Sequence, residues 1–305
     1  LFFIINCMHW LLTGRLSIER IEVEIAQLPD ALVGLKLVQL SDFHFDGLRL
    51  SKQLLRQAIA VTNALEPDLV LLTGDYVTDD PQWIHPLACE LKNLSARAGV
   101  FAILGNHDLW YPHSRQEITG ALEAIGIQVL WNQVASLFEA KLLLVGLADR
   151  YSRQFHPETI MPQLDPSTPR IVLSHNPDTA EALKPYRVDL QLSGHTHGGQ
   201  LVIPGLGPLL AYSNRIFYNR FYYRVQGKLA RIFPPFKVFR PRHFVVSHWD
   251  WSEGLHQIGM NQLYVNRGLG TYPPGRLFCP PEVTVITLVQ GRFVPPCDGS
   301  RRVDY

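Results

Sequence analysis

The sequence predicts a layered α/β fold in which a second sheet packs on the first. Short, unbroken apolar runs such as residues 69–73 and 100–104 are typical of strands that are covered on both faces. Stretches of helical periodicity separate these runs, which favours parallel pairing in the first half of the chain. The strands of the second half look antiparallel, so we assign them to the second sheet. With 305 residues, 47% of them apolar, the chain can bury a large core.

The individual elements follow from the spacing of apolar side chains. Residues 18–26 alternate apolar and polar side chains, which is the period of a half-buried strand. Residues 51–65 have helical spacing and begin with Ser51, a suitable N-cap. The other predicted helices are residues 87–94, 116–124 and 179–183. The other predicted strands are residues 36–41, 69–73, 100–104, 128–130, 134–138, 141–147, 170–174, 189–192, 261–266 and 283–288.

The composition excludes several classes of protein. The 28 basic and 27 acidic residues give a net charge of +1, and the apolar content is too high for a disordered chain. The four cysteines are scattered and show no C-x-x-C spacing, which argues against a disulfide framework and against a thiolate zinc site. They are Cys7, Cys89, Cys279 and Cys297.

The N-terminal segment is apolar. Residues 1–12 (LFFIINCMHWLL) are fewer than the roughly 20 residues that cross a bilayer. We interpret residues 1–16 as the remnant of a membrane anchor and residues 17–305 as one main domain. A buried N-terminal strand or a tail is the alternative. Arg15 and Arg20 follow directly, which favours the cytoplasmic side of a membrane.

Polar side chains follow five of the predicted strands at the points where the strands end. Ligands of open α/β sheets bind beyond the carboxyl ends of the strands, so we expect these side chains to meet. Carboxylate, amide and imidazole donors together suit Mn, Fe, Zn or Mg rather than Cu. The predicted metal ligands are Asp42, His44, Asp75, Asn106, His175, His195 and His197.

The local spacing of these residues has a physical reason. Side chains two positions apart on an extended chain point to the same side, so the D-x-H and H-x-H pairs can each grip one ion or two neighbouring ions. A glycine precedes Asp75, Asn106 and His195 and lets the backbone turn sharply there. Taken singly, Asp42 and Asp75 also fit helix caps, and His175 fits a core histidine.

The motifs D-x-H, G-D, G-N-H-D, H and G-H-x-H, in this order over residues 35–197, resemble the calcineurin-like metallophosphoesterase superfamily. The resemblance implies an α/β/β/α sandwich of two packed mixed sheets flanked by helices. It also implies two divalent metal ions, with Asp42, His44, Asp75 and His197 around one. Asp75, Asn106, His175 and His195 would surround the other, so that Asp75 bridges.

The same resemblance implies catalytic roles for the G-N-H-D pair. His107 would face the leaving group without binding metal, and Asp108 would orient it, although a local turn role also fits Asp108. Two metal ions can clamp the attacking and leaving oxygens of a displacement at phosphorus and lower the pKa of the attacking water. His107 would then protonate the departing oxygen or stabilise the charge of the transition state.

Motifs from residue 194 onward make the resemblance more specific, to one branch of the superfamily. The runs GHTHGGQ (residues 194–200), YVNRGLG (264–270) and CPPE (279–282) are similar to a bacterial membrane-associated branch of the superfamily. Some members of that branch are UDP-2,3-diacylglucosamine pyrophosphatases of lipid A synthesis, and others are phosphodiesterases. Protein Ser/Thr phosphatases carry G-D-x-V-D-R-G, which is absent here. Purple acid phosphatases need a tyrosine where this chain has Thr78.

A basic, aromatic insertion lies at about residues 209–255. Eight basic and no acidic residues fall between positions 190 and 249. Taken as a helix, residues 217–232 place basic side chains on one arc and aromatic and aliphatic side chains on the next, which is typical of a helix at a lipid interface. The alternatives are a helix packed on the core and a nucleic-acid groove. The expected membrane or lipid-substrate contacts are Arg215, Arg220, Arg224, Lys228, Arg231, Phe221 and Tyr222.

These observations predict a hydrolase that cleaves a phosphodiester or pyrophosphate bond at a membrane surface, with UDP-2,3-diacylglucosamine as the first candidate substrate. We expect two divalent ions, Mn first, and Fe, Zn or Mg as alternatives. The expected partners are an anionic membrane surface and a lipid-linked phosphate, with neither nucleic acid nor an obligate protein partner. The expected location is the cytoplasmic face of an inner membrane. The alternatives are a general, cyclic-nucleotide or nucleic-acid phosphodiesterase and a non-catalytic, membrane-docked metal-binding module.

Overall fold

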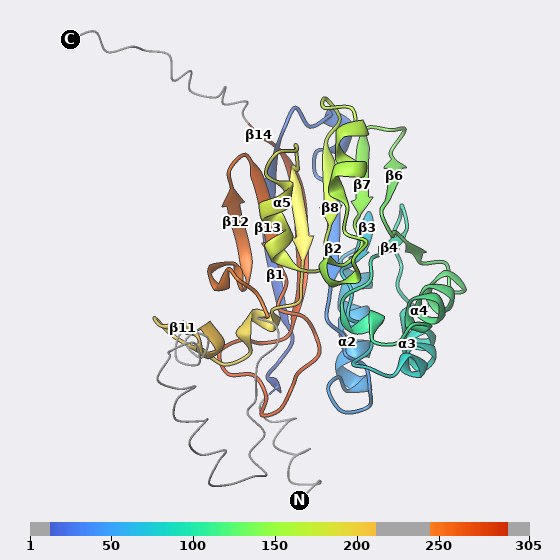
Figure 1. Ribbon diagram of the computed structural model, residues 1–305, viewed down its shortest axis with the longest axis vertical. Coiled ribbons are helices and arrows are strands. Elements are labelled where there is room, and N and C mark those ends of the chain that lie inside the picture. The colour runs from blue at the N-terminus through green and yellow to red at the C-terminus, as the bar shows by residue number, and fades with distance from the viewer. Residues whose placement is uncertain (1–12, 212–244, 292–305) are drawn as a thin grey trace, which may run out of the picture.

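The computed structural model describes residues 13–211 and 245–291. Two six-stranded mixed sheets lie face to face, and helices flank them (Figure 1). The predicted fold class is therefore confirmed. The predictions for residues 1–12, for a helix at 217–232 and for most of the insertion concern residues outside the described ranges.

The first sheet contains the strands that open and close the domain. Its order is β1-β14-β2-β3-β4-β5. Strands β2 to β5 are parallel, whereas β14 runs antiparallel to β2 and parallel to β1. The bounds are β1 Ser17–Ala26, β2 Lys36–Leu40, β3 Leu69–Leu72, β4 Val100–Ala102, β5 Gln128–Val129 and β14 Glu282–Gly291.

The second sheet has the order β12-β13-β9-β8-β7-β6. The antiparallel pairing expected for this half is wrong at its centre, where β13, β9, β8 and β7 are all parallel. Only the edge pairs β12–β13 and β6–β7 are antiparallel, because each joins two strands through a tight turn. The bounds are β6 Gln133–Leu137, β7 Leu142–Gly146, β8 Arg170–Leu173, β9 Leu190–Ser193, β12 Gly254–Ile258 and β13 Asn261–Val265.

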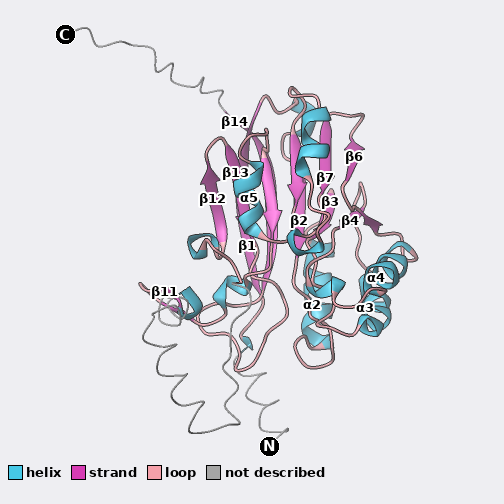
Figure 2. Ribbon diagram, viewed as in Figure 1, coloured by secondary structure: helices cyan, strands magenta, loops and turns pink. Residues whose placement is uncertain are grey.

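The helices cover the outer faces of the sheets. In Figure 2, α2 (Lys52–Ala64), α3 (Ile84–Leu91) and α4 (Ser114–Glu123) gather on one side of the strands, and α5 (Ala180–Leu183) lies apart from them. Ser51 caps α2 as predicted, since its hydroxyl accepts a hydrogen bond from the N–H of Leu54 at 3.1 Å. The helix expected at residues 87–94 begins three residues earlier. Pro86 lies in its first turn, where a proline is tolerated.

Alternating side chains of the central strands build two separate cores. Leu37, Leu71 and Phe101 point into the core between the two sheets. Their neighbours Val38 and Leu72 point into the core under the helices. Both faces of these strands are thus covered, which explains the unbroken apolar runs in the sequence.

Three short strands were not predicted. They are β12 and the hairpin of β10 (Val202–Ile203) and β11 (Gly207–Pro208). Each has a turn-rich sequence with little apolar alternation. Within the described ranges, no helix combines the length and the apolar character needed to cross a membrane.

The core between the sheets gives a direct test of the packing. Leu71 is fully buried there, so Leu71→Ala leaves a cavity and should lower the free energy of unfolding by roughly 2–5 kcal/mol. Urea unfolding followed by circular dichroism measures this change. Met260 is 81% exposed, and Met260→Ala is the matched control, with a change within about 0.5 kcal/mol. Equal effects of the two substitutions would contradict this assignment of the core.

Candidate metal centre

The carboxyl ends of β2, β3, β4, β8 and β9 bring the predicted ligands together. Asp42, His44 and His197 form one buried group whose potential ligand atoms all lie within 4.8 Å of one another. Asp75, His175 and His195 form a second such group. The spacing suits two ions, as the sequence predicts.

Asp75 joins the two groups through one oxygen. Its Oδ2 lies 3.5 Å from Nε2 of His44 and 3.1 Å from Nε2 of His175. Its Oδ1 accepts a hydrogen bond from the backbone N–H of His107 at 2.9 Å. The hydrogen bond at Oδ1 holds the carboxylate in place. Oδ2 faces both groups, which is the position expected of a bridging ligand.

Each ligand histidine is oriented by a protein contact at one ring nitrogen. Nδ1 of His175 donates to the carbonyl oxygen of Thr73 at 2.7 Å, and Nδ1 of His197 donates to that of Gly270 at 3.2 Å. His195 uses the opposite nitrogen, because its Nε2 donates to the carbonyl oxygen of Val245 at 2.8 Å. These contacts select the tautomer and leave the other nitrogen of each ring for the centre.

The unpaired atoms of the site fit divalent cations. Oδ1 of Asn106 and Nε2 of His175 are buried and lack a hydrogen-bond partner among the described residues. Nε2 of His44 lies 3.0 Å from Nε2 of His197, and the latter carries a lone pair because Nδ1 of that ring is the donor. A cation between such nitrogens and carboxylates satisfies all of them.

Electrostatics keep three of the four histidine ligands in the form that binds metal. Burial lowers the pKa of His197 to about 3 and that of His195 to about 4, and it holds the pKa of His44 well below its usual value. These imidazoles are therefore neutral at physiological pH, the form that coordinates metals. Burial acts to raise the pKa of Asp75, but the neighbouring imidazoles, His175 first, outweigh it and keep the carboxyl ionised. At His175, burial acts to lower the pKa, but the surrounding carboxylates, Asp75 first, outweigh it and raise the pKa well above its usual value.

The ligands themselves adopt left-handed backbone conformations. The φ angles are 50° at Asp42, 42° at His44, 56° at Asp75, 71° at His195 and 52° at His197. Few residues other than glycine adopt such angles, and each costs on the order of 1 kcal/mol or more. The strand ends thus bend abruptly at the ligands, which aims their side chains at one point.

The glycine before Asp75 has the expected role, because Gly74 has a φ angle of 96°, whereas the other two glycines have a different one. At Gly105 and Gly194 the need is for close approach rather than for a special φ angle. A Cβ on Gly105 would stand 2.2 Å from Oδ1 of Asp75, and one on Gly194 would stand 2.1 Å from Oδ2 of Asp42. The ligand carboxylates therefore contact the glycine backbone directly, and a side chain at either position would displace them.

The role predicted for Asp108 needs correction. Its buried carboxylate accepts hydrogen bonds from the backbone N–H groups of Asp75, Tyr76, Val77 and Gly105 at 2.8–3.3 Å. Burial, with the nearby charge of Asp75, raises the pKa of Asp108 to about 8. Asp108 thus ties two strand-end loops together, while the ring of His107 is held through Nδ1 by the carbonyl oxygen of Thr78. The sequence could not signal this, because the partners are backbone groups.

His107 presents its remaining nitrogen to the site. With Nδ1 on Thr78, only Nε2 is available to a substrate. His107 also lies within 4.8 Å of ligand atoms of His44 and Asp75. The indole of Trp110 stacks beside it, with ring centroids 5.8 Å apart and an angle of 14° between the planes.

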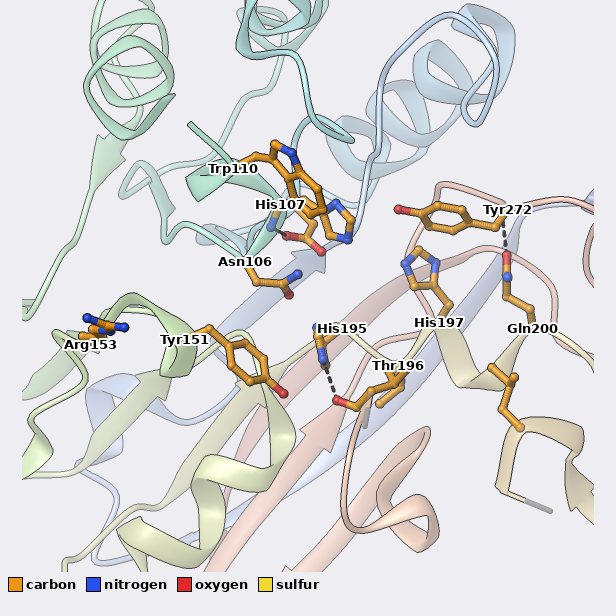
Figure 3. Close-up of a pocket in the computed structure, with 13 residues that line it drawn as sticks. Asn106, His107, Trp110, Tyr151, Arg153, His195, Thr196, His197, Gln200 and Tyr272 are labelled. Atoms are coloured by element: carbon orange, nitrogen blue, oxygen red, sulfur yellow. Dashed lines mark hydrogen bonds between the residues drawn. The ribbon is translucent and has the colours of Figure 1, made fainter. Parts of the chain in front are cut away.

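A pocket of about 760 Å³ opens beside the metal ligands. Figure 3 shows His107, His195 and His197 around its centre, with Tyr272 and Gln200 on one side and Tyr151 and Arg153 on the other. Eight lining residues were not predicted as site residues: Trp110, Tyr151, Arg153, Thr196, Gln200, Leu210, Val245 and Tyr272. Tyr272 places its hydroxyl 3.1 Å from Nδ1 of His44 and so also orients a ligand. Its position in the run YPPG, distant from the metal motifs, gave no signal of this role.

The glycine contacts give a test of the centre. Gly105→Ala drives a methyl group into Asp75 and should weaken binding of both ions, because Asp75 faces both metal groups; the measurement is metal content after reconstitution. Gly120 in α4 has open space around it, so Gly120→Ala is the matched control. It should keep the full metal content and raise the free energy of unfolding by roughly 0.5–1 kcal/mol, because alanine favours helix. Full metal content in Gly105→Ala would argue against a rigid Asp75.

The comparisons with known proteins agree with this geometry. The family model for calcineurin-like phosphoesterases matches residues 35–199. Phosphodiesterase YaeI of Escherichia coli K12 is 32% identical over 275 residues, which cover 89% of this chain and 88% of that protein. The uncharacterized metallophosphoesterase YkuE of Bacillus subtilis 168 is 32% identical over 273 residues, covering 87% and 83%.

A third relative has a lipid-related name. UDP-2,3-diacylglucosamine pyrophosphatase LpxG of Chlamydia muridarum is 27% identical over 305 residues, covering 84% of each chain. The family match includes every predicted metal ligand. Six of the seven form the two groups described above, and the seventh, Asn106, lines the adjacent pocket. The chain therefore belongs to the calcineurin-like phosphoesterase family and is a metal-dependent phosphoesterase.

Proposed function

We propose that this phosphoesterase hydrolyses a phosphodiester or pyrophosphate bond of a lipid-linked substrate, with UDP-2,3-diacylglucosamine as the leading candidate. The observation that carries the proposal is the character of the pocket beside the metal ligands. Trp110, Leu210 and Val245 line it and remain 61%, 40% and 40% exposed. Large apolar side chains at the open mouth of a polar centre suit a substrate that carries both a phosphate and an apolar part.

The charge of the pocket favours a diester or anhydride over a monoester. Arg153 supplies the one guanidinium among the described lining residues, and it lies on the far side of the histidines from Tyr272 (Figure 3). A phosphomonoester dianion is normally held by several charge-assisted donors. A singly charged phosphodiester group needs fewer, and the similar protein YaeI is a phosphodiesterase.

The chain's own residues supply binding and proton transfer in this proposal. When bound, two divalent ions would stabilise the attacking and leaving oxygens and lower the pKa of the attacking water. His107, held by Thr78, offers Nε2 to the departing oxygen and acts as its proton donor. Trp110 stacks on His107 and limits access of water from that side. Mn²⁺ is the first ion to test, because carboxylate, amide and imidazole donors together suit it.

The membrane part of the proposal rests on the sequence. Residues 1–12 are apolar, and the segment from 215 to 242 carries eight basic residues. Basic side chains near an anionic surface contribute roughly 1 kcal/mol each. We therefore place the enzyme at the cytoplasmic face of an inner membrane, with an anionic lipid surface as its partner. A general, cyclic-nucleotide or nucleic-acid phosphodiesterase is the second candidate, favoured by the name of YaeI.

A substrate panel with Mn²⁺ tests the substrate class. UDP-2,3-diacylglucosamine should exceed a bis-aryl phosphate, cyclic AMP and an aryl phosphomonoester in kcat/KM by a factor of about 100 or more, since only it fills both parts of the pocket. A higher kcat/KM for cyclic AMP or for an oligonucleotide would support the second candidate. Steep weakening of oligonucleotide binding with salt would strengthen that reading.

The role of His107 has its own test. His107→Ala should keep two metal ions and lower kcat by about 10²–10⁴, with a smaller loss for a nitrophenolate leaving group than for the more basic phenolate, because a good leaving group needs less protonation. The control is His85→Ala, which removes a histidine from the surface of α3, away from the pocket. Loss of one ion in His107→Ala would make His107 a ligand instead of a proton donor.

Charge reversal tests the membrane contact. Replacing Arg220, Arg224, Lys228 and Arg231 with glutamate should abolish binding to vesicles that contain phosphatidylglycerol and leave hydrolysis of a soluble bis-aryl phosphate intact. The control reverses four exposed lysines elsewhere, Lys52, Lys92, Lys141 and Lys184. Equal vesicle binding by the two variants would exclude a specific lipid contact of this segment.

A further inference from the structure

Asp149 stands at a sixth strand end that no motif of the sequence assigns to the site. Strands β7 and β8 are parallel, with Gly146 opposite Leu173. The pairing continues past the strands, because the N–H of Leu147 donates to the carbonyl oxygen of Leu173 at 3.0 Å. Asp149 lies two residues after Leu147, and the metal ligand His175 lies two residues after Leu173. The topology therefore sets Asp149 beside the second metal group.

The Asp149 side chain is buried, and only one of its two carboxylate oxygens accepts a hydrogen bond. It is 1% exposed. Oδ1 accepts a hydrogen bond from the N–H of Tyr151 at 2.8 Å and so caps the 3-10 turn Arg150–Ser152. Oδ2 has no hydrogen-bond partner in the part of the chain that the structure describes, and it is the one carboxylate oxygen there in this condition. A buried carboxylate with an open oxygen is costly unless positive charge faces it.

Asp149 differs in this respect from Asp108. Asp108 is equally buried, but four backbone N–H groups satisfy its carboxylate. Around Asp149, burial raises the pKa of the carboxyl, and the largest opposing influence is the imidazole of His175. The charged group that acts most strongly on Asp149 thus belongs to the second metal group.

The charge balance of the metal centre favours a further carboxylate close to it. Two divalent ions would bring four positive charges, whereas the ligand carboxylates Asp42 and Asp75 bring two negative charges, and an imidazole that coordinates a metal is neutral. A third carboxylate next to the site lowers the net charge that must be buried. Charges act over longer distances inside a protein than in water, so direct coordination is not required.

We propose that Asp149 is a positioning residue of the metal centre, whose carboxylate raises the affinity of the Asp75, His175 and His195 group for a divalent cation. It acts by its charge beside His175 and is not one of the ligands. Through Oδ1 the same side chain fixes the turn that places Tyr151 in the pocket, where its ring lies 6.2 Å from that of His195. The inference rests on the metal centre and is independent of the lipid-linked substrate.

Asp149→Asn is the test, because asparagine keeps the Oδ1 acceptor for Tyr151 and removes the charge. Binding of Mn²⁺ alone, measured by competition with a chelator, should weaken by about tenfold or more at one of the two sites. The melting temperature of the metal-free protein should stay the same or rise, since a costly buried carboxylate has gone. Asp165→Asn is the matched control. Asp165 accepts the N–H of Ser167 in the same local pattern, but it is exposed and not part of the metal centre.

The opposite outcomes are equally clear. Unchanged affinity for Mn²⁺ in Asp149→Asn would overturn the proposal and leave Asp149 as a helix cap. Asp149→Ser is the second variant, because serine also caps helices and carries no charge. If both variants failed to fold in the absence of metal, the carboxylate would be needed by the fold itself, and the proposal would again be wrong. None of these measurements uses a substrate, so they are unaffected by the outcome of the substrate panel.

Discussion

The structure of the site depends on one buried carboxylate. Oδ2 of Asp75 lies between the imidazole of His44, which follows β2 in the first sheet, and that of His175, which follows β8 in the second sheet. This one atom therefore links the two sheets. Its position is set by backbone groups: the N–H of His107 on Oδ1, and a loop that Asp108 holds through the N–H groups of Asp75 and Tyr76. Because these contacts are all buried, none of them competes with water, and small displacements of Asp75 would disturb both metal groups at once.

The two-sheet core supplies the rigidity that this arrangement needs. Five ligands occupy left-handed backbone conformations, which cost on the order of 1 kcal/mol or more each and persist only where the surroundings impose them. The strands that lead into these ligands are covered on both faces, by the second sheet and by the helices. The strain at the ligands is therefore offset by apolar burial next to it. A single-layer sheet would relax at its strand ends and lose the convergence of the side chains.

Features of the site that depend on local residue spacing could be predicted from the sequence. Features that depend on contacts with backbone groups could not. The D-x-H, G-D and G-H-x-H runs could be placed at strand ends because apolar runs and polar ends are both local features. The true role of Asp108 was hidden, since its four partners are N–H groups with no side-chain identity. The parallel centre of the second sheet was also missed, because β13 joins β9 across about 70 residues of chain, and sequence order does not fix such a neighbour.

The metal centre and the pocket are built from different kinds of chain segment. The metal ligands lie at the ends of regular strands, whereas the pocket walls come from irregular segments: the turn after His107, the turn at Tyr151, the residues just before and after the β10–β11 hairpin, and the chain at Val245. Loops accept substitution and insertion more readily than strands. Substitutions in these walls would therefore change what the pocket admits while Asp75 and its neighbours stay fixed. The chain is similar both to a phosphodiesterase, at 32% identity, and to a pyrophosphatase, at 27% identity, and walls of this kind would let related proteins differ in the phosphoester that they accept.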